Sequence, residues 1–334
     1  MGKLFFGLEL HEYYDANTIL AEIQLGEQLG YDAVWLGDSQ MIWREMYVLL
    51  GAAAKVTSRV LLGTGVTNPI TRLPVVTASA ITTLQELSGG RAVLGVGTGD
   101  SSVRTLGLKP ANLATLERFV SDVRDLCFGR PVGAAKGEVR LSFGAPEKCP
   151  PIVVAARGPK SLRLGGRIAD GVIFSTGRSG SILQNAIGYI QAGLKERTLP
   201  SARFQIIFMR PVAIAPERKK AFAAVRPHVA RTLLSYPWEM SEAAATAKKK
   251  LEEVYNYYEH MNPTALHQES IPDEVVPEFA IAGTAADCRE QVVDLFEQGI
   301  DQLHIRPYSV DGAPRSSAIE AFAKEVIKPL RHKS

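Results

Sequence analysis

The feature that most constrains the fold is a repeated alternation between short apolar segments and longer segments of helical periodicity. The first pair is an apolar run at residues 4–10 and a stretch in which Ile19, Ile23 and Leu29 recur at helical spacing up to Gly30. A short apolar run predicts a buried strand, and apolar residues spaced three or four apart predict an amphipathic helix. Gly30 is a typical helix stop. The chain therefore begins with a strand and a helix.

The same unit recurs along the chain, so that eight strands are predicted. The seven later strands are expected at 33–36, 60–66, 92–96, 152–155, 172–174, 205–214 and 302–305. Strands that are apolar on both faces and separated by helices are typical of a parallel sheet covered by helices. Eight such strands can close, which predicts the fold class α/β, a (β/α)8 TIM barrel with insertion segments.

The competing architecture is a doubly wound open sheet with a second domain, which would place a glycine-rich dinucleotide fingerprint after the first strand. The first predicted strand instead leads into His11, Glu12 and two tyrosines. We therefore expect one TIM-barrel domain over residues 1–334. Between residues 216 and 277 the pattern becomes irregular and helical, and we interpret this region as a helical insertion within the barrel.

Composition excludes several functional classes. The 38 basic and 35 acidic residues are scattered and give a net charge of only +3, which argues against a nucleic-acid partner. The chain has no apolar run long enough to span a membrane, and we expect no export signal. Cys127, Cys149 and Cys288 lie far apart without a CxxC motif, which favours a reducing cytoplasm over a zinc site or a disulfide framework.

Polar residues, glycines and small apolar residues lie at and just after the ends of the predicted strands, where a barrel carries its chemistry. They are Glu9; Asp38 and Ser39; Gly65, Val66 and Thr67; Thr98, Gly99 and Asp100; Ala155, Ala156, Arg157 and Gly158; and Ser175, Thr176 and Arg178. The last two groups resemble anion cradles, because glycine turns expose backbone N–H groups and a helix N-terminus adds partial positive charge. Alternatively, Gly158 and Gly177 only close tight turns.

The acidic candidates also leave alternatives open. Glu9 is either catalytic or a rim residue that pairs with a basic neighbour. Asp38 and Asp100 either contribute to a site or cap the helices that follow them. The histidines and carboxylates show no spacing that would suggest a metal site.

Longer segments carry a family resemblance. They read WLGDS at 35–39, LGTGVTNPITRLP at 62–74, ELSGGRAVLGVGTGD at 86–100 and PIVVAARGPK at 151–160. In this combination and order the chain resembles the bacterial luciferase-like superfamily, in particular its deazaflavin branch with the methylenetetrahydromethanopterin reductases. The resemblance implies a TIM barrel that binds coenzyme F(420), a two-electron hydride carrier, or FMN as in other branches.

The resemblance also implies roles for residues. Asp38 would contact the deazaflavin with Ser39 beside it, and the Gly65–Val66 bond next to Thr67 would be a non-prolyl cis peptide behind the ring. Thr98, Gly99 and the amides of 155–158 would hold the pyrimidine side and the phosphate tail. Glu9 matches a carboxylate near the reacting carbon, and Asp100 is the second catalytic candidate.

One difference from the related dehydrogenases narrows the class of reaction. The alcohol and sugar-phosphate dehydrogenases of this branch carry histidine at the position of Ser39 and glutamate at that of Asp100. Serine cannot accept a proton at neutral pH as imidazole can, which argues against alcohol oxidation.

We therefore expect a cytoplasmic, F(420)-dependent oxidoreductase that delivers hydride to a C=C, C=N or C=O carbon of a small molecule. The alternatives are an FMN-dependent monooxygenase and a non-catalytic ligand sensor. A homodimer is expected, with the apolar run 46–50 as a candidate face.

Overall fold

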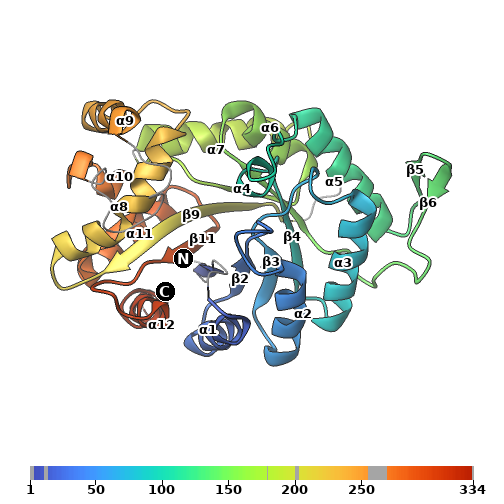
Figure 1. The fold of residues 1–334 in the computed structure, drawn as a ribbon, viewed down its shortest axis with the longest axis horizontal. Coiled ribbons are helices and arrows are strands. Elements are labelled where there is room, and N and C mark those ends of the chain that lie inside the picture. The colour runs from blue at the N-terminus through green and yellow to red at the C-terminus, as the bar shows by residue number, and fades with distance from the viewer. Residues whose placement is uncertain (1–3, 11–13, 179, 200–202, 255–268, 333–334) are drawn as a thin grey trace. The chain divides into compact units, whose positions relative to one another are not determined.

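The computed structural model describes residues 4–10, 14–178, 180–199, 203–254 and 269–332 (Figure 1). All eight predicted strands are present, each within two residues of its expected bounds. They are β1 (Phe5–Leu10), β2 (Ala33–Leu36), β3 (Leu61–Thr64), β4 (Ala92–Val96), β7 (Ile152–Ala156), β8 (Gly171–Phe174), β9 (Gln205–Ile214) and β11 (Gln302–Pro307). Each strand leads along the chain into a helical segment, as the (β/α)8 fold class requires.

The helices predicted between these strands are also present. They are α1 (Ala16–Leu29), α2 (Met46–Val56), α3 (Pro74–Leu87), α5 (Leu113–Cys127), α6 (Pro159–Ile168), α7 (Gly180–Leu194) and α11 (Ala285–Glu297). The Asp15 carboxylate caps the amides of Asn17 and Thr18 at the start of α1, and Gly30 ends this helix with a φ of 95°. A left-handed residue at this position is best supplied by glycine. None of the described helices is long and apolar enough to cross a membrane.

The chain forms two compact units, and the first comprises Gly7–Ile173 and Tyr189–Ile206. Within it β1, β2, β3, β4 and β7 are paired in this order, and every pair is parallel. Trp35 is 2% exposed and lies between Glu9 and Gly63 in the register. A Cβ atom at Gly63 would lie 2.4 Å from the Trp35 ring. Glycine in these strands therefore makes room for the indole, as close approach in a sheet requires.

The second unit comprises the start of the chain through Phe6, Phe174–Gly188 and the chain from Ile207 onward. Here β9 pairs in parallel with β11 and, at its end, with β10 (Ile281–Gly283). The helices α8 (Arg218–Leu234), α9 (Glu242–Val254) and α10 (Val276–Phe279) bury a cluster that includes Phe222, Tyr236 and Phe279. These helices occupy the region interpreted as an insertion, of which residues 255–268 lie outside the described residues.

Some elements were not predicted. The three-residue strand β10, the helix α4 (Ser101–Arg104) and the antiparallel hairpin of β5 (Val132–Ala134) and β6 (Gly137–Val139) are too short to show a period. The helix expected at 318–330 is instead α12 (Arg315–Phe322), a π-helical turn (Ala323–Ile327) and α13 (Lys328–Arg331). Pro329 lies in this last element, and its missing N–H favours a local change of helix type.

We predict that Gly95→Ala destabilises the protein by about 1–3 kcal/mol, the usual cost of overpacking. A Cβ atom at position 95 would lie 2.1 Å from the Thr64 carbonyl oxygen and 3.0 Å from the Trp35 ring. The free energy of unfolding in urea measures the effect. Gly133→Ala in β5 is the control, because no described atom lies within 4 Å of its Cβ position. Equal stability of the two variants would contradict the assigned packing.

Candidate functional site

The residues that follow β2 and β3 meet at the carboxylate of Asp38, which is 5% exposed. Its Oδ2 accepts hydrogen bonds from Thr67 Oγ1 and Arg72 Nε, both at 2.7 Å, and its Oδ1 accepts one from Arg72 Nη2 at 2.9 Å. A bidentate guanidinium contact is strong and fixes orientation. Asp38 is thus held in place by Arg72 and Thr67, and the residue that caps the following described helix α2 is Glu45.

Arg72 is a member of this cluster that sequence reasoning did not single out, although it lies inside the quoted segment 62–74. The hydrogen bonds with Asp38 raise the pKa of its guanidinium. Arg72 also binds the Glu45 carboxylate and lies 4.9 Å from the centre of the Tyr47 ring. These contacts place the cation between two carboxylates and an aromatic face, and therefore fix the geometry around Asp38.

A second layer of polar contacts links the loops after β2, β3 and β4. Ser39 Oγ and Ser101 Oγ are 2.6 Å apart, and Asn68 Nδ2 donates to Ser102 Oγ at 3.0 Å. Asn68 Oδ1 in turn accepts from the amides of Ile70 and Thr71. The three loops are therefore tied together by short side chains, and Ser39 lies in this layer.

The peptide bond between Gly65 and Val66 is cis, as the resemblance implied. The loop that contains it is anchored to β4, because Thr67 N donates to Gly95 O at 3.0 Å and Gly97 N donates to Thr67 O at 2.9 Å. A Cβ atom at Gly97 would lie 3.2 Å from Val66 Cγ2. Val66 therefore packs directly against the end of β4.

The two acidic catalytic candidates differ in environment. Glu9 is 6% exposed, so it is not a rim residue, and it lies opposite Trp35 in the sheet. The Asp100 side chain is 38% exposed and pairs with Arg104 at 2.9 Å and Arg157 at 3.4 Å. Asp100 precedes α4, but its carboxylate makes no capping hydrogen bond to the described helix. Of the two, only Glu9 is shielded from solvent.

Ala155 and Ala156 end β7, and Arg157 and Gly158 form the turn between β7 and α6. The amides of Arg157 and Gly158 donate to Ser161 Oγ at 3.2 and 3.1 Å. Gly158 has a φ of −123°, and no described atom lies within 4 Å of its Cβ position. Neither the turn nor the packing therefore requires glycine here. Ala155 Cβ would lie 3.4 Å from a Cβ atom at Gly97, so the end of β7 packs against the end of β4. Gly99, two residues further on, has a φ of 94°, which suits glycine.

The turn after β8 belongs to the second unit, and its residues contact other residues of that unit. Thr176 is buried, and Gly177 N donates to the Tyr236 hydroxyl. A Cβ atom at Gly177 would lie 2.8 Å from that hydroxyl, so packing against Tyr236 accounts for this glycine. The Arg178 guanidinium pairs with Asp294 at 3.2 Å. Ser175 is the first residue of this turn. The contacts of this turn therefore differ from those of the turn after β7.

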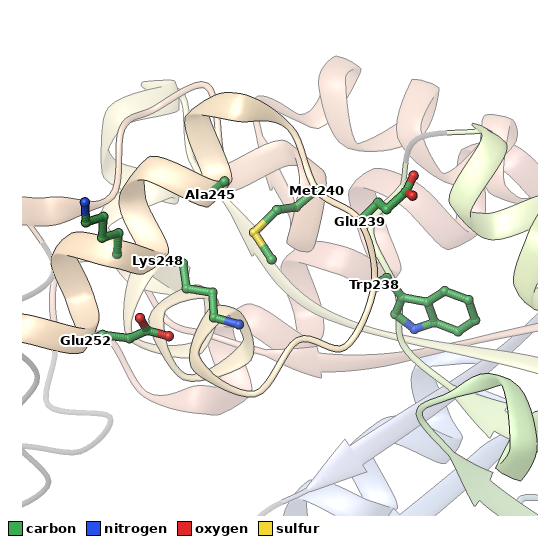
Figure 2. Close-up of a pocket in the computed structure, with 7 residues that line it drawn as sticks. Trp238, Glu239, Met240, Ala245, Lys248 and Glu252 are labelled. Carbon is green, nitrogen blue, oxygen red and sulfur yellow. The ribbon is translucent and has the colours of Figure 1, made fainter.

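A pocket of about 510 Å³ lies elsewhere in the second unit (Figure 2). It is lined by Trp238, Glu239, Met240, Ala245, Lys248, Lys249 and Glu252. Its charges are balanced, with two ammonium and two carboxylate groups around an indole and a thioether. In neither unit do the described residues include a group of three or more metal-ligating side chains.

The chain is similar, over nearly its whole length, to known enzymes. The 5,10-methylenetetrahydromethanopterin reductase of Methanolobus tindarius is 29% identical over 333 residues, which cover 96% of this chain and 99% of the relative. The enzyme of the same name from Archaeoglobus fulgidus is 30% identical over 344 residues and covers 98% and 99%.

The fold is likewise that of a solved enzyme. The coenzyme F(420)-dependent tetrahydromethanopterin reductase from Methanopyrus kandleri matches with a TM-score of 0.78 at 24% identity, over 98% of this chain and 99% of that one. Residues 5–302 match the model of the luciferase-like monooxygenases. The chain is therefore a (β/α)8 barrel that belongs to the luciferase-like monooxygenase family.

Proposed function

We propose that the protein is an oxidoreductase that uses coenzyme F(420) to transfer hydride to an electrophilic C=C, C=N or C=O carbon of a small organic molecule. The observation that carries this proposal is the similarity, over nearly the whole length of both chains, to two enzymes named as methylenetetrahydromethanopterin reductases. An FMN-dependent monooxygenase is the second candidate, because the matching family is described by that activity.

The strand ends of the first unit fit such a cofactor. No described atom lies within 4 Å of the Gly158 Cβ position at the N-terminus of α6, and a helix N-terminus after a glycine turn is a common phosphate site. Residues 155–158 would hold the phosphate tail. Asp38, Ser39, the segment 65–67, Thr98 and Gly99 would hold the ring system. When bound, the reduced coenzyme supplies the hydride.

The residues of this chain would supply orientation and the proton. Asp38 is held by Arg72 and Thr67, so it would act as a fixed acceptor for an N–H or O–H donor. Glu9 is a buried carboxyl group on β1, and a carboxylic acid in a site shielded from water can donate a proton in step with hydride transfer. Ser39 lacks the basicity of imidazole, which favours reduction over alcohol oxidation.

We also propose that the protein acts in the cytoplasm as a homodimer. The run 46–50 contributes less surface than expected, because Met46, Leu49 and Leu50 are buried in the core. Val48 is 71% exposed, however, and Leu73 and Val76 at the start of α3 are 64% and 48% exposed. Glu45 accepts from both Val48 N and Arg72, which brings these two helix starts together. They form an apolar face suited to a second copy.

The first functional prediction concerns the cofactor. The purified protein should bind F(420) more tightly than FMN, as judged by the absorbance and fluorescence of each cofactor on titration. Gly158→Val should raise the dissociation constant by at least tenfold, about 1.4 kcal/mol, by obstructing the phosphate cradle. Gly133→Val, in an exposed hairpin, should bind normally. Preferential binding of FMN would favour the monooxygenase, and unchanged affinity of Gly158→Val would remove this turn from the site.

The second prediction concerns Glu9. Glu9→Gln keeps the size of the side chain but removes the acid, so cofactor affinity should be retained while single-turnover hydride transfer slows by about a hundredfold or more. Glu86→Gln, on an exposed position of α3, is the matched control. Wild-type rates for Glu9→Gln at every pH would retire Glu9 and make Asp100 the next carboxylate to test.

The third prediction concerns assembly. Replacing Val48 and Leu73 together with glutamate should convert a dimer to a monomer, because it places four charges in a symmetric apolar interface. Light scattering after size-exclusion chromatography measures the mass. A monomeric wild-type protein, or a double variant that remains dimeric, would show that this face is not the interface.

A further inference from the structure

One arginine is buried inside the second unit. Arg210 lies on β9 and is 1% exposed, and its guanidinium carbon lies 4.5 Å from the centre of the Phe208 ring. Its Nη2 donates to the carbonyl oxygen of Glu278 at 3.2 Å. Its Nη1 is buried as well and has no hydrogen-bond partner among the described atoms. Arg210 therefore carries a buried donor that the described part of the chain does not satisfy.

The charge of Arg210 is not balanced by a carboxylate of the described residues. The ionisable groups that act on it are the Tyr236 phenol and the Arg178 guanidinium. Burial lowers the pKa of Arg210 to about 9, and the Arg178 charge acts in the same direction, so the side chain is still a cation at neutral pH. Arg178 itself pairs with Asp294. A buried charge is costly unless it is paired, and an anion beside Arg210 would remove that cost.

The turn after β8 brings a second donor close to Arg210. The amide of Gly177 donates to the Tyr236 hydroxyl, and the next amide, that of Arg178, donates at 2.9 Å to the same Glu278 oxygen that Arg210 binds. Because the Tyr236 oxygen accepts from Gly177, the proton of this hydroxyl is available for another acceptor. Burial raises the pKa of Tyr236, which keeps that proton in place. Two buried donors, one of them charged, therefore lie within one short network.

We propose that the second unit binds a chloride ion between Arg210 Nη1 and the Tyr236 hydroxyl. The ion would accept a hydrogen bond from each donor and balance the buried charge. Phe208 packs on the guanidinium and Phe279 lies against the Tyr236 ring, and both phenylalanines are at most 1% exposed. The cost of moving an ion into such surroundings rises with its charge, so a small monovalent anion is favoured over phosphate or sulfate.

A cavity beside this network agrees with that choice. It has a volume of about 580 Å³, and both Arg178 and Glu278 line it. Its lining includes three carboxylate side chains, which repel a multivalent anion more strongly than a monovalent one. They belong to Glu274, Glu278 and Asp294. The cavity therefore gives a small ion a path toward the Arg210 network without itself being an anion site.

The test compares the full chain in sodium chloride and in sodium gluconate at equal ionic strength. Chloride should raise the thermal midpoint by about 2 °C or more over gluconate, because an ion that binds only the folded state stabilises it. Crystals grown in sodium bromide should show an anomalous peak within hydrogen-bonding distance of Arg210 Nη1. Equal midpoints in the two salts, or no bromide peak at Arg210, would overturn the proposal.

Variants separate this site from a general effect of salt. Arg210→Met keeps the apolar stem but removes the cation, so its midpoint should not depend on which salt is present. In gluconate it should be at least as stable as the wild type, because an unbalanced buried charge is gone. Tyr236→Phe removes one donor and should require several-fold more chloride for the same response.

Arg218→Met is the matched control, because it removes an exposed guanidinium of α8 that pairs with Asp287. This variant should respond to chloride as the wild type does. A full chloride response in Arg210→Met would contradict the assigned site. If Arg210→Met does not fold, the bromide density of the wild-type protein decides, because it locates the ion directly.

Discussion

The packing of one indole organises the first unit. Trp35 occupies the inner layer of the sheet, and the strands beside it carry glycine at 63 and 95 because a Cβ atom there would meet the ring. Gly65 lies one step further along, with its Cβ position 3.1 Å from Trp35 Cβ. The strands are therefore packed tightly around the Trp35 ring, and they give rigid support to the loops that follow them. Binding groups on such loops need a rigid scaffold beneath them.

In the loops after these strands, the buried charge of Asp38 determines which side chains lie around it. A buried carboxylate is costly unless it is paired and hydrogen-bonded. Arg72 and Thr67 supply both conditions, and Arg72 is itself positioned by Glu45 and Tyr47. This network explains why a chain with ordinary composition contains a rigid polar cluster at the ends of apolar strands. Glu9 lies buried on the neighbouring strand β1, and it is the residue to which the proposed function assigns the proton.

The glycines of the two turns, Gly158 and Gly177, have different surroundings. Both turns were interpreted from sequence as anion cradles. At Gly158 neither φ nor packing demands glycine, because no described atom lies within 4 Å of its Cβ position. At Gly177 the hydroxyl of Tyr236 occupies the space that a side chain would need. Tyr236 lies in the segment where the sequence showed no regular period, so its partner could not be read from the pattern.

The sequence alone determined the strands, most helices and the family. Apolar periodicity records which faces are buried, and that signal is strong for elements of ordinary length and absent for the three-residue strands β5, β6 and β10. The positions of Glu9, Asp38 and Gly158 followed from the ends of those strands.

Only the tertiary structure determined which side chains contact one another. Arg72 lies 34 residues from Asp38, and Ser161 Oγ accepts hydrogen bonds from the amides of Arg157 and Gly158. Such contacts depend on how helices and loops pack in three dimensions. Local spacing carries no record of that packing.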